Sequence, residues 1–337
     1  MMINLLVAMA CQPQVSNARL IGRFLSDGLG GYACEWPGSA VQFYAESPSV
    51  VVHLRASTAN DRWQVDVDGT ATSVLKLDPE QLDYKISLPD SKRHLVTLVR
   101  RTECFSGATT WKGVENKGIE APPTAARRIL VVGDSISAGF GVDGKTKEEA
   151  YSFDTANAYL THGWVAARQL NADCTIVAWS GRKMWPDNTI PEIFDFALPS
   201  TRRGQSVFLD WSTTHAIIVN LATNDFGKGI PDKAKWTGAY RGFLGKLRER
   251  FPEAHIYLAT GSMMSDNWPP KENHLTTLKG YLDSIASIPY DKKVHRIDFA
   301  VQDEKDGIGS GWHPNAVTQG KMAKVLVGAL RKDLGWK

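Results

Sequence analysis

Four short segments of the chain carry residues that could together cleave an ester. Ser135 follows the apolar run 129–132, so it stands where a buried strand ends and the chain turns into small-residue backbone. A serine hydroxyl attacks a carbonyl when a positioned base takes its proton, and a histidine with a pKa of about 6.5 suits that task. His313, in the segment 311–315 before a C-terminal helical pattern, is the candidate base.

Two further segments supply donors for the negative charge that develops on the carbonyl oxygen. Gly181 follows the strand-like run 174–178, and its N–H is unhindered. Asn224 follows the run 216–221 and carries a side-chain amide. With the Ser135 N–H, these groups would form an oxyanion hole. Because ligands of open α/β sheets bind at the carboxyl ends of the strands, we expect all four segments to meet there.

From residue 127 onwards the chain alternates strand-like runs with helical patterns. Apolar residues recur at helical spacing in two places, at Leu160, Trp164, Ala167 and Leu170 and at Tyr240, Phe243, Leu244 and Leu247. Further helices are expected over 275–288 and around 322–327, and further strands over 255–259 and 294–299. About five strands alternating with helices predict an α/β fold with a doubly wound parallel sheet over residues 127–337.

The preceding part of the chain has a different pattern. Residues 19–105 alternate β-branched runs with turns, and the Asp68-Gly69 turn signal joins two of the runs. This pattern predicts an all-β sandwich or jelly-roll domain. Residues 106–126 are rich in Gly, Thr, Lys and Pro and are expected to form a linker, and residues 1–18 a leader or a disordered start.

The four segments resemble the conserved blocks of the SGNH (GDSL) hydrolases, with Ser135, Gly181, Asn224 and His313 matching in turn. The likeness narrows to carbohydrate esterase family 2, because the segments 21–24, 65–69 and 94–103 are similar to the N-terminal β domain of that family. Ser180-Gly181-Arg182 and Asn224-Asp225-Phe226 also resemble its versions of the blocks. The likeness covers the chain from about Arg19 to its end.

The resemblance implies a carbohydrate O-acetyl esterase that works through an acetyl-serine intermediate, without cofactor or metal, on acetylated oligo- or polysaccharides such as xylan or glucomannan. The chain carries no HExxH motif, His-x-His pair or carboxylate cluster typical of a metal site. Two other functions stay open. A lipase or thioesterase of the same superfamily would need an apolar acyl channel, and a glycan-binding protein with an impaired hydrolase site would release no acetate.

Two positions depart from the superfamily pattern. An aspartate usually stands three residues before the histidine, where this chain has Ser310. We expect a Ser–His dyad, in which the Ser310 hydroxyl or a backbone carbonyl could orient His313; a relocated carboxylate, Asp303 or Asp306, and an impaired enzyme are the alternatives. Ala222 replaces a usual glycine, and we expect its methyl group to affect the shape of the pocket more than the reaction.

The chain has 11 tryptophans, and four of them fall in or near the expected site loops: Trp179, Trp185, Trp268 and Trp312. Aromatic rings pack on the apolar face of a sugar, although they more often lie in a core. Trp312, beside the base, is the candidate substrate-binding residue.

Composition limits the partners. The net charge is +3 and no run of five basic residues occurs, so nucleic-acid binding has little support. No segment reaches the ~18 apolar residues of a membrane span.

The largely apolar segment 3–11 ends at Cys11. It is consistent with a leader for secretion or with a cell-surface lipoprotein site at Cys11, and equally with a disordered or edge-strand start of the chain. Cys34, Cys104 and Cys174 are expected to be buried thiols, with a Cys34–Cys104 disulfide as the alternative. The oligomeric state does not follow from the sequence.

Overall fold

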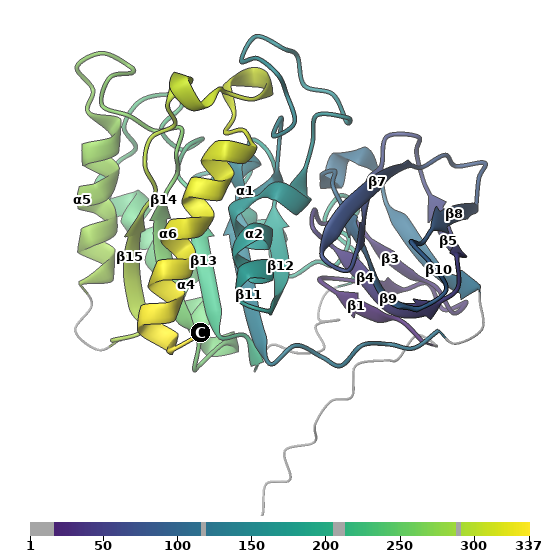
Figure 1. The fold of residues 1–337 in the computed structure, drawn as a ribbon. Helices are drawn as coiled ribbons and strands as arrows, with labels where there is room; N and C mark the ends of the chain where they lie inside the picture. Colours follow the sequence, from purple (N-terminus) through teal and green to yellow (C-terminus); the bar gives the residue numbers. More distant parts are fainter. Residues whose placement is uncertain (1–16, 116–118, 205–212, 288–290) are drawn as a thin grey trace, which may run out of the picture.

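The computed structural model describes residues 17–115, 119–204, 213–287 and 291–337. These residues form an N-terminal β-rich region and a C-terminal region in which helices cover a parallel sheet (Figure 1). Of the leader expected over 1–18, residues 1–16 with Cys11 lie outside the described residues.

The N-terminal region consists of two antiparallel five-stranded sheets. The first has the order β1-β4-β9-β6-β7, with bounds Arg19–Ile21, Ala40–Glu46, Arg93–Arg100, Arg62–Val67 and Thr70–Lys76. The second has the order β2-β3-β10-β5-β8, with bounds Leu25–Ser26, Tyr32–Cys34, Thr109–Glu115, Ser49–Ala56 and Asp83–Ser87. Alternate residues of both sheets, among them Phe43, Leu54, Trp63 and Trp111, share one core. This is the expected β-sandwich.

The pairing of β10 differs from the expected linker over 106–126. Thr109–Glu115 lies between β3 and β5 in the second sheet, and Glu120 pairs with Tyr44 of β4. The lysine and glycine of this segment suggested a loop, but Thr109 and Trp111 alternate inward and are buried. The connection to the next strand is therefore shorter than the sequence indicated.

The C-terminal region is built on a parallel sheet with the order β12-β11-β13-β14-β15. The bounds in that order are Ala172–Ala178, Arg127–Gly133, Ala216–Asn220, His255–Thr260 and Val294–Asp298. The chain runs from β11 to one edge and then returns past it to β13, so the strand order reverses between β11 and β13. In doubly wound sheets, ligands bind outside the carboxyl ends of the strands at this point.

Helices cover both faces of the sheet (Figure 1). Their bounds are Ser135–Ala138 (α1), His162–Gln169 (α2), Ile190–Ile193 (α3), Lys233–Arg250 (α4), His274–Ala286 (α5) and Ala316–Leu334 (α6). One core cluster joins α1, α2 and α6 to one face, and another joins α3, α4 and α5 to the other. None of the helices in the described ranges is both long and apolar enough to cross a bilayer.

The two regions are joined by buried polar contacts. Trp36 donates its indole N–H to the carbonyl oxygen of Phe196 at 2.9 Å, and Trp164 donates to that of Gly38 at 3.0 Å. The Tyr159 hydroxyl donates to Asp66 at 2.6 Å. Such bonds, once buried, are costly to break, so they fix the β-sandwich against the α/β region.

The three described cysteines are unpaired. Cys34, Cys104 and Cys174 are buried free thiols. The expectation of buried thiols is confirmed, and the Cys34–Cys104 disulfide that the sequence left open is wrong.

Candidate active site

Ser135 is the first residue of α1, directly beyond the end of β11. The turn is tight: a Cβ on Gly133 would lie 2.2 Å from the Ser137 hydroxyl oxygen, so only glycine fits there. The side chain of Asp134 caps α1 by accepting the Ile136 N–H at 3.0 Å. Ser135 is thereby held at the helix start, at the carboxyl edge of the sheet near the strand-order reversal.

His313 meets Ser135 across 178 residues of chain. Its Nε2 lies 2.8 Å from the Ser135 hydroxyl oxygen, and its Nδ1 lies 2.9 Å from the carbonyl oxygen of Gly311. Because a carbonyl oxygen only accepts, Nδ1 carries the proton in the neutral ring, and Nε2 is free to accept from the serine. Helix α6, which follows His313, helps to hold the two together, since Gln319 donates to the Ile136 carbonyl of α1 at 2.8 Å.

The surroundings of His313 favour its neutral form. Burial lowers the pKa of the imidazole below its usual 6.5, although backbone contacts with Gly311 and Ser310 act in the opposite direction. The ring of Phe140 packs on the imidazole with centroids 4.3 Å apart, and Tyr151 stacks on Phe140 at 4.2 Å. The imidazole of His313 is therefore neutral over a wider range of pH than that of a solvated histidine.

None of the described carboxylates occupies the usual place of a triad acid behind His313. Ser310 is fully buried, and its hydroxyl has no hydrogen-bond partner within the described chain. Asp303 caps a short turn by accepting the Lys305 N–H, and Asp306 pairs with Lys321. The group that accepts from Nδ1 is the Gly311 carbonyl, one of the two acceptors that the sequence left open for a dyad.

Gly181 lies in a turn in which the Arg182 N–H donates to the Trp179 carbonyl at 3.2 Å. Its φ of +77° is a conformation that glycine adopts without steric cost. No acceptor for the N–H of Gly181 or of Ser135 occurs among the described residues. Two backbone donors are therefore available to a ligand.

Asn224 follows β13 and donates one amide N–H to the Arg182 carbonyl at 2.9 Å. This bond attaches Asn224 to the turn that carries Gly181 and leaves the second N–H of the amide for a ligand. Ala222, the other departure from the superfamily pattern, is buried and packs in the core with φ 159°. Its methyl group thus packs into the protein interior.

Two buried carboxylates that sequence reasoning did not assign hold the loop around Gly181. Glu103 accepts from both the N–H and the hydroxyl of Ser180, at 2.8 and 2.6 Å. Asp225 accepts from the N–H of Trp185 at 2.9 Å and from the indole of Trp236 at 2.8 Å. Burial raises the pKa of Glu103 to about 7 and that of Asp225 to about 6. Sequence position alone could have indicated these two residues. Asp225 adjoins Asn224, and Glu103 is the last residue of the segment 94–103, which resembles the N-terminal β domain of carbohydrate esterase family 2.

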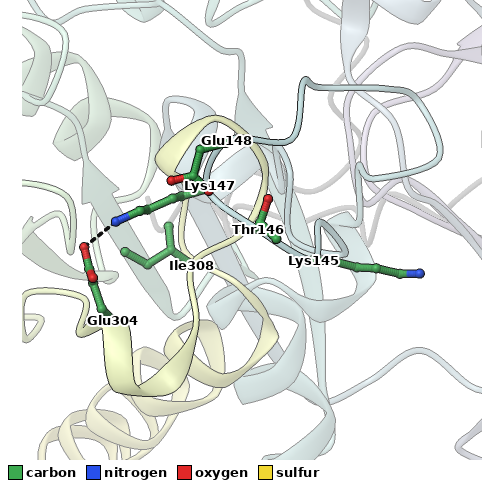
Figure 2. A pocket seen from close by; sticks show the side chains of 6 residues that line it. All are labelled: Lys145, Thr146, Lys147, Glu148, Glu304 and Ile308. Atoms are coloured by element: carbon green, nitrogen blue, oxygen red, sulfur yellow. Dashed lines mark hydrogen bonds and ion pairs between the residues drawn. The ribbon is translucent and has the colours of Figure 1, made fainter.

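Trp312, the predicted substrate-binding residue, directly precedes His313 in the chain and is 51% exposed. The ammonium of Lys147 sits 4.3 Å from its ring centre and is paired with Glu304 at 2.6 Å. Lys147 and Glu304 also line a shallow open pocket, shown in Figure 2. Of the other three tryptophans, Trp268 is 75% exposed, and Trp179 and Trp185 are partly buried against the core.

The described residues contain no group of three or more His, Cys, Asp or Glu side chains arranged to hold a metal ion. The chemistry available at this edge of the sheet is thus a serine paired with an imidazole whose neutral form is favoured. The segments that carry Gly181 and Asn224 follow strands that end at the same edge.

The comparisons with known families agree with this arrangement. Residues 131–319 match the model of the GDSL-like Lipase/Acylhydrolase family, and residues 20–123 match that of the Carbohydrate esterase 2 N-terminal region. The two matches together cover both regions of the fold.

Curated relatives and solved structures extend the likeness. The chain is 30% identical over 94% of its length to the "Cellulase/esterase CelE" of Acetivibrio thermocellus, of which it spans 39%. It is 26% identical over 89% of its length to an "Acetylxylan esterase / glucomannan deacetylase" of Cellvibrio japonicus, of which it spans 84%. A family two carbohydrate esterase from Clostridium thermocellum, solved in complex with cellohexaose, superposes with a TM-score of 0.85 at 27% identity, covering 95% of this chain and 100% of that one.

Proposed function

Since the chain belongs to the GDSL-like lipase/acylhydrolase family, within its carbohydrate esterase family 2 branch, we propose that it removes acetyl groups from acetylated plant polysaccharides of the xylan or glucomannan type. The observation that carries the proposal is the 2.8 Å contact between the Ser135 hydroxyl and His313 Nε2. The name of the Cellvibrio relative supports the choice of substrate.

The reaction begins with Ser135 as nucleophile and His313 as general base. As the Ser135 oxygen bonds to the acetyl carbonyl carbon, His313 Nε2 takes the hydroxyl proton. The resulting oxyanion accepts hydrogen bonds from the N–H groups of Ser135 and Gly181 and from the Asn224 amide. When the carbonyl re-forms, the carbon–oxygen bond to the sugar breaks, and His313 returns its proton to the sugar oxygen.

Water completes the cycle at the acetyl-serine. His313, neutral again, takes a proton from the attacking water, and the same donors stabilise the second oxyanion. Collapse breaks the bond to the Ser135 oxygen, which recovers the proton from His313 as acetate leaves. Throughout, the Gly311 carbonyl keeps the proton on Nδ1 and interacts favourably with the transient imidazolium through its dipole.

The substrate side of the proposal involves Trp312. Its exposed ring, oriented by Lys147, offers an apolar face for a sugar ring beside the base. We propose that the protein acts outside the cell, where its polysaccharide substrates occur, and that the reaction needs no cofactor.

Acetate release tests the proposal. We expect the protein to release acetate from acetylated xylooligosaccharides and from 4-nitrophenyl acetate, with little activity on an octanoyl ester, and Ser135→Ala to lower kcat by at least about 10⁴-fold. Ser137→Ala, two residues along α1, is the matched control and should stay within a few-fold of the unaltered protein. Undiminished acetate release by Ser135→Ala would overturn the assignment.

A further inference from the structure

We propose that Glu103, a residue of the N-terminal β-rich region, is a positioning residue of the oxyanion hole: by holding Ser180 it sets the direction of the Gly181 N–H. The inference rests on the proposed function and adds to it a defined role for the β-sandwich in catalysis. No part of the proposed reaction mechanism itself requires Glu103 to touch substrate.

The contact between Glu103 and Ser180 is specific, and the Glu103 side chain is shielded from solvent. The side chain is fully buried, and its two carboxyl oxygens accept separately from the N–H and the hydroxyl of Ser180. One carboxylate that binds two donors of one residue fixes the position and the rotation of that residue. Glu103 thus holds the peptide that precedes Ser180 and the Ser180 side chain, directly before the peptide that carries the Gly181 N–H.

Glu103 is itself well anchored. Its carbonyl oxygen accepts from the N–H of Ser106 at 3.0 Å, from the Ser106 hydroxyl at 2.7 Å and from the guanidinium of Arg100 at 3.3 Å. Arg100 is fully buried and lies 3.4 Å from the carboxylate of Asp61. The carboxylate that holds Ser180 therefore projects from a rigid part of the sandwich.

The rest of the turn is fixed from its other side. Asn188 donates to the Gly181 carbonyl at 3.1 Å, and Asn224 donates to the Arg182 carbonyl at 2.9 Å. These bonds hold the peptides that follow Gly181, whereas Glu103 holds the one that precedes Ser180. With both sides fixed, the Gly181 N–H between them has one orientation, which is the condition for stabilising an oxyanion without reorganisation.

The chain contains a matched control for this contact. Glu35, also in the N-terminal region, accepts from the N–H and the hydroxyl of Ser200, at 2.8 and 2.5 Å. Glu35 is buried as well, but Ser200 adjoins no donor of the site. The two contacts are chemically alike and differ in what stands beside the serine.

The experiment compares Glu103→Ala, Glu103→Gln and Glu35→Ala by melting temperature, kcat and KM on acetylated xylooligosaccharides. We expect Glu103→Ala to lower kcat by about 10- to 100-fold with KM within about threefold, because a misdirected donor mainly affects the transition state. Glu103→Gln should recover most of kcat, since its amide oxygen accepts the Ser180 N–H and its NH₂ donates to the hydroxyl. Glu35→Ala should lower the melting temperature comparably and leave kcat within about twofold.

Three outcomes contradict the inference. The first is a Glu103→Ala protein whose kcat falls no further than that of Glu35→Ala, because the contact would then only join the regions. The second is a folded Glu103→Gln protein as slow as Glu103→Ala. If Glu103→Ala does not fold, Ser180→Ala removes half of the contact, and an unchanged kcat there is the third. All three leave the proposed function standing, which is decided separately by Ser135→Ala.

Discussion

The two sides of the proposed site, the base side around His313 and the oxyanion side around Gly181, are supported by different kinds of group. On the base side, His313 is oriented by the Gly311 carbonyl, and backbone bonds attach its loop to the segment 141–149: Ser310 donates to the Gly141 carbonyl at 3.0 Å and Gly311 to the Glu149 carbonyl at 3.1 Å. On the oxyanion side, the buried carboxylates of Glu103 and Asp225 hold the turn and the loop that follows it.

The difference matches what the proposed roles of the two sides require. A histidine needs one acceptor that fixes its tautomer, and a carbonyl provides this without a charge. A turn carrying N–H donors needs several of its groups held at once, which a two-oxygen carboxylate does well. Burial raises the pKa of Glu103, and the hydrogen bonds from Ser180 act in the opposite direction by favouring the carboxylate.

The largest effect that tests this comparison is expected at the oxyanion donors. Asn224→Ala removes one donor and the bond to the Arg182 carbonyl, and we expect kcat to fall by about 10²- to 10³-fold. Steady-state kinetics on 4-nitrophenyl acetate measures this, with the melting temperature as the check on folding. A loss of less than about fivefold in a folded variant would show that Asn224 does not contact the oxyanion.

Much of this arrangement follows from local pattern. Apolar runs and helical spacing can be read directly from the sequence. They predict the strand before Ser135, the strand ends that carry the donors and the helix after His313. The parallel strand order then brings the four segments to one edge.

The supporting residues could not be predicted in the same way. Glu103 lies 77 positions from Ser180, and nothing local distinguishes a glutamate that will be buried by another region from one that will be solvated. The acceptor for His313 is a backbone atom, which every residue possesses, so the sequence could only name it among alternatives. The sequence does not predict β10, because lysine and glycine within Thr109–Glu115 are typical of a loop and obscure the inward alternation of Thr109 and Trp111.

A smaller effect is expected in the pH dependence of the reaction. Burial lowers the pKa of His313, so the neutral base persists below pH 6.5, and the acid limb of kcat/KM should have its midpoint below that value. Phe140→Ala exposes the imidazole and should move the midpoint upward, whereas Glu103→Gln should leave the limb in place. A midpoint above 6.5 would instead indicate a carboxylate partner for the histidine.

The smallest effects on kcat are expected from changes at Ser310 and Asp303, the residues considered in place of the usual triad acid. Ser310→Ala deletes a hydroxyl without a partner in the described chain, and Asp303→Asn keeps an oxygen that can still accept the Lys305 N–H. Neither change touches the bond from His313 Nδ1 to the Gly311 carbonyl, so kcat should stay within about twofold for both. Initial rates on acetylated xylooligosaccharides measure this. If Asp303→Asn instead lost a hundredfold or more, Asp303 would act on His313 in the working enzyme, and the base side would depend on a carboxylate as the oxyanion side does.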